Sequence, residues 1–163
     1  MQIGVVSDTH NNLKNIDRII SLFNEENIDL VIHTGDVTNA ISMEKFSRLK
    51  CKLIGVYGNN DRNEKGLKEV AFKYNFLFQE PPNSINLRNR NIAIFHEPDL
   101  ISSYLKEHKD IDLVLHGHTH RYREEFIGGT LCFNPGESAG LMKGKNAIGL
   151  IDLSNLNVRR IFF

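Results

Sequence analysis

The sequence has 163 residues, a typical length for one domain, and 25% of them are charged. Its 20 basic side chains balance 20 acidic ones, whereas proteins that bind nucleic acids or membranes usually carry a positive excess. No stretch reaches the roughly 20 apolar residues of a membrane-spanning helix, and Cys51 and Cys132 form no CxxC motif. We therefore expect a single domain over residues 1–163, located in the cytoplasm.

The first half of the sequence alternates short apolar runs with amphipathic segments. Between residues 13 and 23, apolar residues recur at intervals of three and four, which is typical of a helix with one buried face. We expect strands at residues 3–6, 29–33 and 52–57, and helices at residues 13–23, 43–49 and 67–74. This alternation predicts a parallel sheet that is covered by helices and joined by right-handed crossovers.

The second half of the sequence is richer in short strands. The polar residues 88–90 and the glycine pair 128–129 each separate two apolar runs, which indicates two hairpins. We expect strands at residues 84–87, 91–95, 113–116, 125–127, 131–133, 147–153 and 158–163. The sequence therefore predicts one α/β domain in which two sheets pack back to back.

Four polar clusters each come directly after an expected buried strand. They are Ser7 to His10, Gly35-Asp36, Gly58 to Asp61 and Gly117 to His120. In α/β sheets, ligands collect in the crevice beyond the carboxyl ends of the parallel strands. We therefore expect the side chains of Asp8, Asp36 and Asn59 to lie side by side, with histidines delivered to the same edge.

Candidate ligands occur in pairs that are two residues apart, Asp8 with His10 and His118 with His120. In extended backbone, the two side chains of such a pair would point the same way. Carboxylate, amide and imidazole groups without a thiolate suit a borderline divalent metal. One carboxylate can bridge two such ions about 3.5–4 Å apart, an arrangement that serves phosphoryl transfer. Without cations, buried carboxylates would repel one another.

Five motifs resemble, in order and spacing, those of the calcineurin-like metallophosphoesterases. They are Asp8-x-His10, Gly35-Asp36, Gly58-Asn59-x-Asp61, His96 after an apolar strand, and Gly117-His118-x-His120. Each motif alone is weak, because an Asp or Asn after a strand is usually a turn or helix-cap residue. The five together are highly specific. The short chain and the segment Asn134-Pro135-Gly136 resemble the small prokaryotic phosphodiesterase branch of this family.

The resemblance implies a four-layer α/β/β/α sandwich with two metal ions that share Asp36. The ligands of the first metal would be Asp8, His10, Asp36 and His120. Those of the second would be Asp36, Asn59, His96 and His118. The implied reaction is phosphodiester hydrolysis, with a hydroxide shared by the ions as nucleophile. We expect manganese as the metal. Nickel, iron, cobalt and zinc are alternatives, because the supply of metals in the cell often decides which ion is bound.

Asn60 departs from the pattern of many family members, which place a histidine here to stabilise the phosphoryl group or protonate the leaving oxygen. An Asn donates a hydrogen bond but cannot deliver a proton at physiological pH. We count Asn60 and the bridging Asp36 as the catalytic residues. We expect good rates only with leaving groups that depart without a proton.

Several polar residues beside the motifs have a structural and a functional interpretation. Glu97 either faces solvent or accepts a hydrogen bond from a metal-bound water. Asp61 either caps backbone donors of its loop or orients a ligand histidine. Ser138 belongs to a tight turn and is a weaker candidate for a phosphate contact. Arg62, Arg121 and Arg123 either bind a phosphate or serve only as surface charges. Structural roles are expected for His33 and His116, which lie in apolar strands, whereas His108 is expected to be solvated on a charged helix.

The leading hypothesis is an enzyme that acts on a small phosphodiester substrate. A second hypothesis is a catalytically weak or inactive interaction scaffold, such as the retromer's small subunit, which resembles this fold. The retention of all seven ligand positions argues against the scaffold, whereas Asn60 keeps it open. Charge neutrality argues against a nuclease. We expect no membrane partner, and a homodimer is open, since the apolar end 161–163 suits a strand or an interface.

Overall fold

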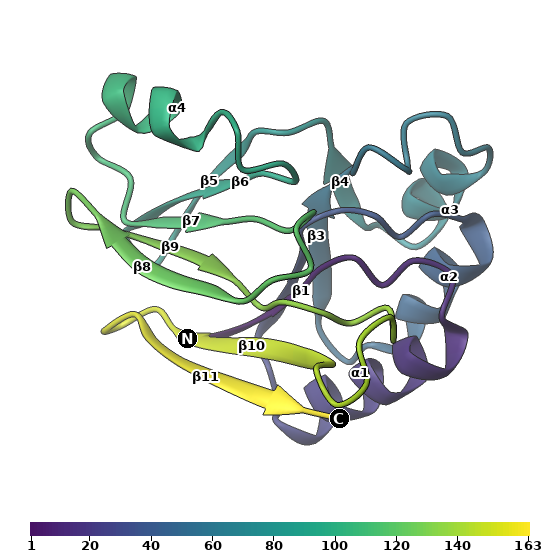
Figure 1. Ribbon diagram of the computed structural model, residues 1–163. Helices are drawn as coiled ribbons and strands as arrows, with labels where there is room; N and C mark the ends of the chain where they lie inside the picture. Colours follow the sequence, from purple (N-terminus) through teal and green to yellow (C-terminus); the bar gives the residue numbers. More distant parts are fainter.

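Two mixed β-sheets stack face to face in the computed structural model, which describes residues 1–163 (Figure 1). The six-stranded sheet has the order β11-β10-β1-β2-β3-β4, and the five-stranded sheet has the order β5-β6-β7-β9-β8. The first sheet consists of β1 (Gln2–Val6), β2 (Leu30–His33), β3 (Lys52–Val56), β4 (Leu77–Gln79), β10 (Ala147–Asp152) and β11 (Asn157–Phe162). The second consists of β5 (Asn83–Leu87), β6 (Arg90–Ile94), β7 (Leu113–Leu115), β8 (Arg123–Ile127) and β9 (Thr130–Asn134).

The helices cover the outer faces of the sheets. They are α1 (Leu13–Glu25), α2 (Ala40–Lys45), α3 (Leu67–Lys73) and α4 (Ile101–Glu107), with a 3₁₀ turn η1 (Phe46–Arg48) after α2. Figure 1 places α1, α2 and α3 beside the six-stranded sheet and α4 beside the other. The predicted helix at residues 43–49 is in fact α2 followed by η1. It begins earlier because the Asn39 side chain caps it, accepting a hydrogen bond from Ser42 N at 2.8 Å.

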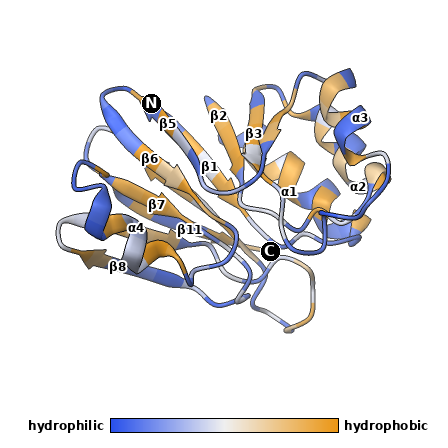
Figure 2. Cartoon of the chain, turned by 90° about the horizontal axis from the view of Figure 1, so that it is seen from above, coloured by the Kyte–Doolittle hydropathy of each residue, from blue (hydrophilic) through white to orange (hydrophobic).

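Three separate apolar cores lie between these four layers. One joins Val6 of β1 and the α1–α3 helices, and includes Ile16 and Phe23 of α1. A second lies between the sheets and includes Val5 of β1 and Leu115 of β7. The smallest joins the five-stranded sheet to α4. The hydrophobic strands of both sheets are visible in Figure 2. The predicted four-layer α/β/β/α sandwich is therefore confirmed.

The parallel order β1-β2-β3 follows from the alternation of strands and helices in the first half of the chain. The antiparallel pairing of β1 with β10 closes the sheet from the C-terminal side. The three-residue strand β4 continues the parallel set but has too few residues for a recognisable pattern. At the helix interface, Gly4 leaves room for Phe23, because a Cβ there would lie 2.4 Å from the ring.

None of the helices combines the length and the hydrophobicity that a membrane-spanning helix needs.

Candidate metal centre

All seven predicted ligands lie in the segments that follow the carboxyl ends of strands. Asp8 and His10 follow β1, and Asp36 follows β2. Asn59 follows β3, and His96 follows β6. The strand β7 is followed by His118 and His120. The two sheets therefore contribute ligand candidates from both sides of one edge of the sandwich, as the strand-end argument predicts.

One group of donor atoms is formed by Asp8, His10 and His120, whose ligand atoms lie within 4.8 Å of one another. The rings of His10 and His120 are stacked, and their Nε2 atoms are 3.3 Å apart. His120 Nε2 lies 3.8 Å from Asp8 Oδ1. The carboxylate of Asp8 is buried and accepts hydrogen bonds from Ser7 Oγ and from His118 N. Two imidazole nitrogens and a carboxylate thus converge on one point.

A second group surrounds the side-chain oxygen of Asn59. His96 Nε2 lies 2.8 Å from Asn59 Oδ1, and His118 Nδ1 lies 3.0 Å from the same oxygen. His96 Nε2 is also 3.5 Å from Asp36 Oδ1. The structure thus brings together the four side chains that the family resemblance places around one metal, Asp36, Asn59, His96 and His118.

Asp8 connects the two groups, because its carboxylate also lies within 4.8 Å of ligand atoms of Asp36 and His96. The carboxylate of Asp36, expected as the bridge, accepts hydrogen bonds from Asn60 N at 2.9 Å and from Asn60 Nδ2 at 2.7 Å. Asn60, the other predicted catalytic residue, is therefore in contact with Asp36. Asp8 is thus the carboxylate common to both groups, and Asp36 lies beside it in the group that contains His96.

The prediction that each ligand pair lies on extended backbone is wrong. Asp8, His10, His118 and His120 have φ values of 51°, 46°, 68° and 54°, and Asp36 has 61°. These left-handed conformations turn His118 toward Asn59 and His120 toward His10, so the two rings do not point the same way. Each costs of order 1–3 kcal/mol in a non-glycine residue, and such residues gather at functional sites. Asp, Asn and His are the side-chain types that tolerate this conformation best.

Glycines allow the strand-end loops to approach one another. A Cβ on Gly58 would lie 2.1 Å from Asp36 Oδ1, and a Cβ on Gly117 would lie 1.7 Å from Ser7 Oγ. Neither clash is avoidable without moving a carboxylate or its partner. The glycines of the predicted motifs are thus required by packing around Asp36 and Asp8.

Glu137 is a site residue that the sequence analysis missed. It is buried, and its Oε2 lies 2.6 Å from His120 Nδ1, while its Oε1 accepts a hydrogen bond from Leu141 N. A carboxylate at Nδ1 holds the proton there and leaves the Nε2 lone pair directed at the ligand group. The adjacent Asn134-Pro135-Gly136 segment resembles the family and indicates a tight turn, but it assigns no role to the acid that follows. An acid directly after this turn is the one signal that pointed to it.

We expect Glu137→Ala to weaken metal binding or activity by about 10–100-fold, because such supporting partners of metal-binding histidines typically contribute that much. Glu137→Gln keeps an oxygen that accepts from His120 Nδ1 and should lose less. Metal affinity measured by titration of both variants checks this prediction. Equal losses in the two variants would show that the hydrogen bond to His120 is not the cause.

Asp61 has the capping role predicted for it. It is buried, and its Oδ2 accepts hydrogen bonds at 2.8 Å from both Asp36 N and Gly58 N, while Oδ1 accepts from Thr38 N at 2.7 Å. The alternative, that Asp61 orients a ligand histidine, is wrong; Glu137 has that role. By tying the loop after β2 to the loop after β3, Asp61 holds Asp36 in its place.

His33 and His116 have the structural roles expected for them. His33 is buried, and its Nδ1 accepts from Gly35 N while its Nε2 lies 3.0 Å from Thr9 Oγ1. Burial lowers the pKa of His33 to about 3, so the ring is neutral. Burial likewise lowers the pKa of His116 to about 4. His108 is exposed, as expected; it lies just after α4, with its ring centre 4.1 Å from that of Tyr104.

The remaining candidates make contacts of their own. Glu97 Oε2 lies 3.8 Å from Arg62, so these two half-exposed side chains neutralise each other. Ser138 is buried, and its hydroxyl donates to the carbonyl of Ser7, which makes it a loop residue rather than a phosphate ligand. Arg123 pairs with Glu125. Of the three arginines, Arg121 alone forms no ion pair.

The charges of the buried groups are strongly coupled. Burial raises the pKa of Asp8, and the hydrogen bond from Ser7 only partly offsets this effect. Burial would also raise the pKa of Asp36, but hydrogen bonding and charge from His96, with help from Asn60, hold it well below its usual range. Burial would lower the pKa of His96, yet the carboxylates of Asp36 and Asp8 raise it. The centre therefore favours positive charge between its carboxylates.

This donor set fits divalent metal ions. His96 Nδ1 lies 2.9 Å from the carbonyl of Thr34, to which it donates its proton, so the Nε2 lone pair is directed at the oxygens of Asn59 and Asp36. Lone pairs that face one another in a buried site need a proton or a cation between them. The mixture of imidazole, carboxylate and amide oxygen, without thiolate, is the one that borderline transition metals prefer.

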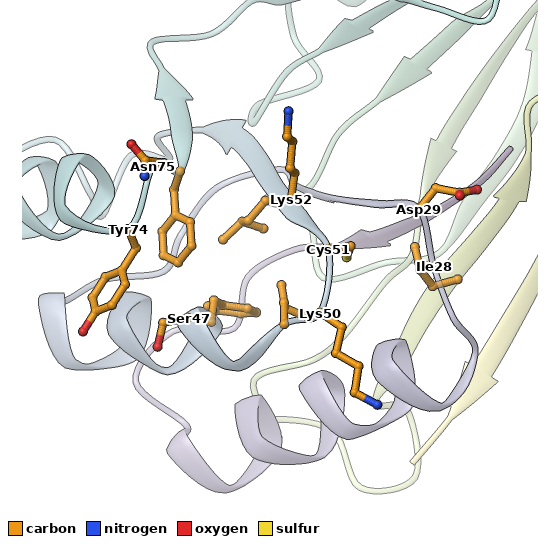
Figure 3. A pocket seen from close by; sticks show the side chains of 12 residues that line it. Ile28, Asp29, Ser47, Lys50, Cys51, Lys52, Tyr74 and Asn75 are labelled. Atoms are coloured by element: carbon orange, nitrogen blue, oxygen red, sulfur yellow. The ribbon is translucent and has the colours of Figure 1, made fainter.

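The largest cavity, of about 590 Å³, lies elsewhere (Figure 3). Its lining includes Asp29, which precedes β2, Lys52, the first residue of β3, and Tyr74, which follows α3. The candidate ligands follow the carboxyl ends of the same strands, whereas this cavity is at the amino ends. It therefore belongs to the opposite end of the six-stranded sheet.

A two-sheet α/β sandwich with this constellation of acids, amide and imidazoles at one edge defines a metal-dependent phosphoesterase. The chain belongs to the calcineurin-like phosphoesterase superfamily, whose domain model matches residues 1–156. The family resemblance seen in the five sequence motifs is thereby confirmed.

Individual relatives support this assignment over the whole chain. Phosphodiesterase MJ0936 of Methanocaldococcus jannaschii is 34% identical over 167 residues, which cover 99% of this chain and 98% of that protein. Phosphodiesterase YfcE of Escherichia coli K12 is 26% identical over 174 residues, covering 97% and 91%. A solved structure described as a novel archaeal phosphodiesterase has a TM-score of 0.90 at 32% identity, with all of both chains covered.

Proposed function

We propose that residues 1–163 form a single domain that hydrolyses phosphodiesters with the help of two divalent metal ions. Asp8, His10, Asp36 and His120 would hold one ion, and Asp36, Asn59, His96 and His118 the other. The observation that carries this proposal is the convergence of imidazole lone pairs on buried carboxylate and amide oxygens. Similarity to two phosphodiesterases over nearly the whole chain supports the reaction type.

When bound, the two ions would supply the Lewis acidity that activates water and neutralises charge on the phosphoryl oxygens. The protein's own groups do the positioning. Glu137 keeps the proton of His120 on Nδ1, and the Thr34 carbonyl does the same for His96. Asp61 fixes the backbone of Asp36. Because these partners are buried and hydrogen-bonded, the ligand atoms need little reorganisation during the reaction.

Asn60 limits the range of leaving groups. Its Nδ2 can donate a hydrogen bond, as it does to Asp36 Oδ2, but it carries no proton that it can give to a departing oxygen. Asn60→His should raise the rate on poor, alkyl-type leaving groups by about 10²-fold, the lower range for a positioned general acid. The rate on p-nitrophenyl esters should change much less. Rates on an alkyl and a nitrophenyl diester, measured side by side, check this expectation, and an unchanged ratio contradicts it.

We further propose manganese as the preferred ion and the cytoplasm as the location. Cys51 and Cys132 are free thiols, which suits a reducing compartment. A panel of phosphomonoesters and phosphodiesters, assayed after metal-free protein is reloaded with one metal at a time, tests the function and the ion together. We expect hydrolysis of bis-p-nitrophenyl phosphate, highest with manganese. Bound metal without turnover of any phosphoester would instead favour the interaction scaffold.

A further inference from the structure

A second cavity, of about 380 Å³, opens directly beside the metal centre. His120 and its partner Glu137 form one wall, so a group in this cavity lies next to a candidate metal ligand. The rest of the lining comes from the segments after β7 and β9 and from β11: Arg121, Tyr122, Met142, Lys145, Arg160 and Phe162. None of these six residues has a role in holding the metals. We refer to this cavity as the His120 pocket.

The cations of the His120 pocket lack acidic partners. Arg121, Lys145 and Arg160 form no ion pair, whereas every other arginine except Arg88 pairs with a carboxylate. The Nε of Arg160 donates to the carbonyl of Pro135 at 3.1 Å, and its terminal nitrogens donate to no protein acceptor. Two of the three unpaired arginines of the chain therefore line one pocket. They give it a local positive charge that the neutral composition of the whole chain conceals.

The acids of the pocket do not cancel this charge. Glu137 is already engaged by His120 Nδ1 and by Leu141 N. Glu124 is not part of the lining; it accepts a hydrogen bond from the hydroxyl of Tyr122 and forms no ion pair with Arg160, although its charge acts to raise the pKa of that guanidinium. Donors of Arg121, Lys145 and Arg160 thus remain available to an anion, and guanidinium groups match a phosphate particularly well.

Two aromatic rings pack against one of these cations, Arg160. The guanidinium carbon of Arg160 lies 4.1 Å from the ring centre of Tyr122 and 4.6 Å from that of Phe162. Arg160 and Phe162 alternate along β11 and so share a face, while Arg159 pairs with Glu26 on the other face. Tyr122 is 47% exposed and Phe162 is 58% exposed. Exposed aromatic rings beside a cation are suited to stack on a planar group of a ligand, such as a nucleic-acid base.

We propose that the His120 pocket binds the nucleoside side of the substrate, and that the preferred substrate is a nucleotide diester carrying a second phosphate. The base would stack against Tyr122 and Phe162. The second phosphate would meet Arg121, Arg160 and Lys145, while the scissile phosphate lies beyond His120. The volume of about 380 Å³ is at the small end for ligand sites, which suits one nucleotide rather than two. This inference rests on the proposed phosphodiesterase function and assigns its specificity.

Two matched substrates test the inference. Thymidine 5′-(p-nitrophenyl phosphate) and its 3′-phosphorylated derivative have the same leaving group and differ only in the second phosphate. We expect kcat/KM to be at least about tenfold higher for the 3′-phosphorylated ester, because one hydrogen bond to a charged group contributes about that factor to binding. Arg121→Gln and Lys145→Gln, both at exposed positions, should each reduce this ratio severalfold. Arg88→Gln removes an unpaired arginine in the turn between β5 and β6, and should leave the ratio unchanged.

Binding to metal-free protein provides a measurement that needs no turnover. Thymidine 3′,5′-bisphosphate should bind in a calorimetric titration, and Arg121→Gln should raise its Kd about tenfold. Deoxyribose 3,5-bisphosphate, which lacks the base, should bind about tenfold more weakly than the nucleotide. A wild-type ratio near one, or variants that change both substrates equally, would overturn the pocket assignment. If no phosphodiester is hydrolysed at all, the proposed function fails, and the titration alone decides about the pocket.

Discussion

Asp36→Asn is expected to lower kcat/KM on bis-p-nitrophenyl phosphate by about 10³-fold. A bridging carboxylate contributes to both metal ions, and the charge stabilisation that such ions give the transition state is worth several kcal/mol. Each 1.36 kcal/mol is tenfold in rate. An amide at position 36 still accepts a hydrogen bond from Asn60 N, so the loop should keep its shape. The loss should therefore come from metal binding rather than from unfolding.

A matched control for this substitution is Asp99→Asn. Asp99 is exposed, forms no side-chain hydrogen bond and lies three residues after His96. It should retain wild-type activity and metal content. Metal content of Asp36→Asn, measured after dialysis, should fall below that of the wild type, while its thermal unfolding remains cooperative. Full activity in Asp36→Asn would show that the Asp36 carboxylate is not needed as a metal ligand.

Asp61→Ala is expected to reduce the free energy of unfolding by about 3–5 kcal/mol. The carboxylate of Asp61 accepts hydrogen bonds from Asp36 N, Gly58 N and Thr38 N, and its removal leaves these three backbone donors without an acceptor. Each unpaired buried donor costs about 1–3 kcal/mol, and water that enters the gap recovers part of that. For a chain of this length, the melting temperature should fall by about 10 °C.

Asp61→Asn distinguishes the contribution of the hydrogen bonds to stability from that of side-chain size. Its single oxygen can accept from both Asp36 N and Gly58 N, but its amide group then faces Thr38 N, so one donor is lost instead of three. The loss of stability should be roughly a third of that in Asp61→Ala. Chemical denaturation of the two metal-free variants measures both values. An Asp61→Ala variant as stable as the wild type would show that the tie between the two loops contributes nothing.

The fold was predictable because its signals are local. Apolar spacing in α1 and short apolar runs at β1, β2 and β3 define a helix and strands without any knowledge of the tertiary structure. The motif residues were predictable as a group because strand ends of a parallel sheet meet at one edge. The pairing of β1 with β10 was not, because nothing in either strand records which partner it takes.

The details of the site depend on tertiary contacts that no motif contains. The positive φ values of His118 and His120 arise because loops from several strand ends meet there, and the two-residue spacing suggested extended backbone instead. Glu137 contacts His120 across 17 residues of sequence. The unpaired state of Arg160 is visible only once every other charged partner is placed, since its neighbour Arg159 looks identical in the sequence and is paired.

Anomalous X-ray diffraction from crystals soaked in manganese tests the central claim most directly. We predict two strong peaks between the loops that follow β1, β2, β3, β6 and β7, with the Asp36 carboxylate in contact with both. The protein atoms around the peaks should come from Asp8, His10, Asp36, Asn59, His96, His118 and His120. Peaks elsewhere on the molecule, or no peak within this cluster at saturating manganese, would contradict the account.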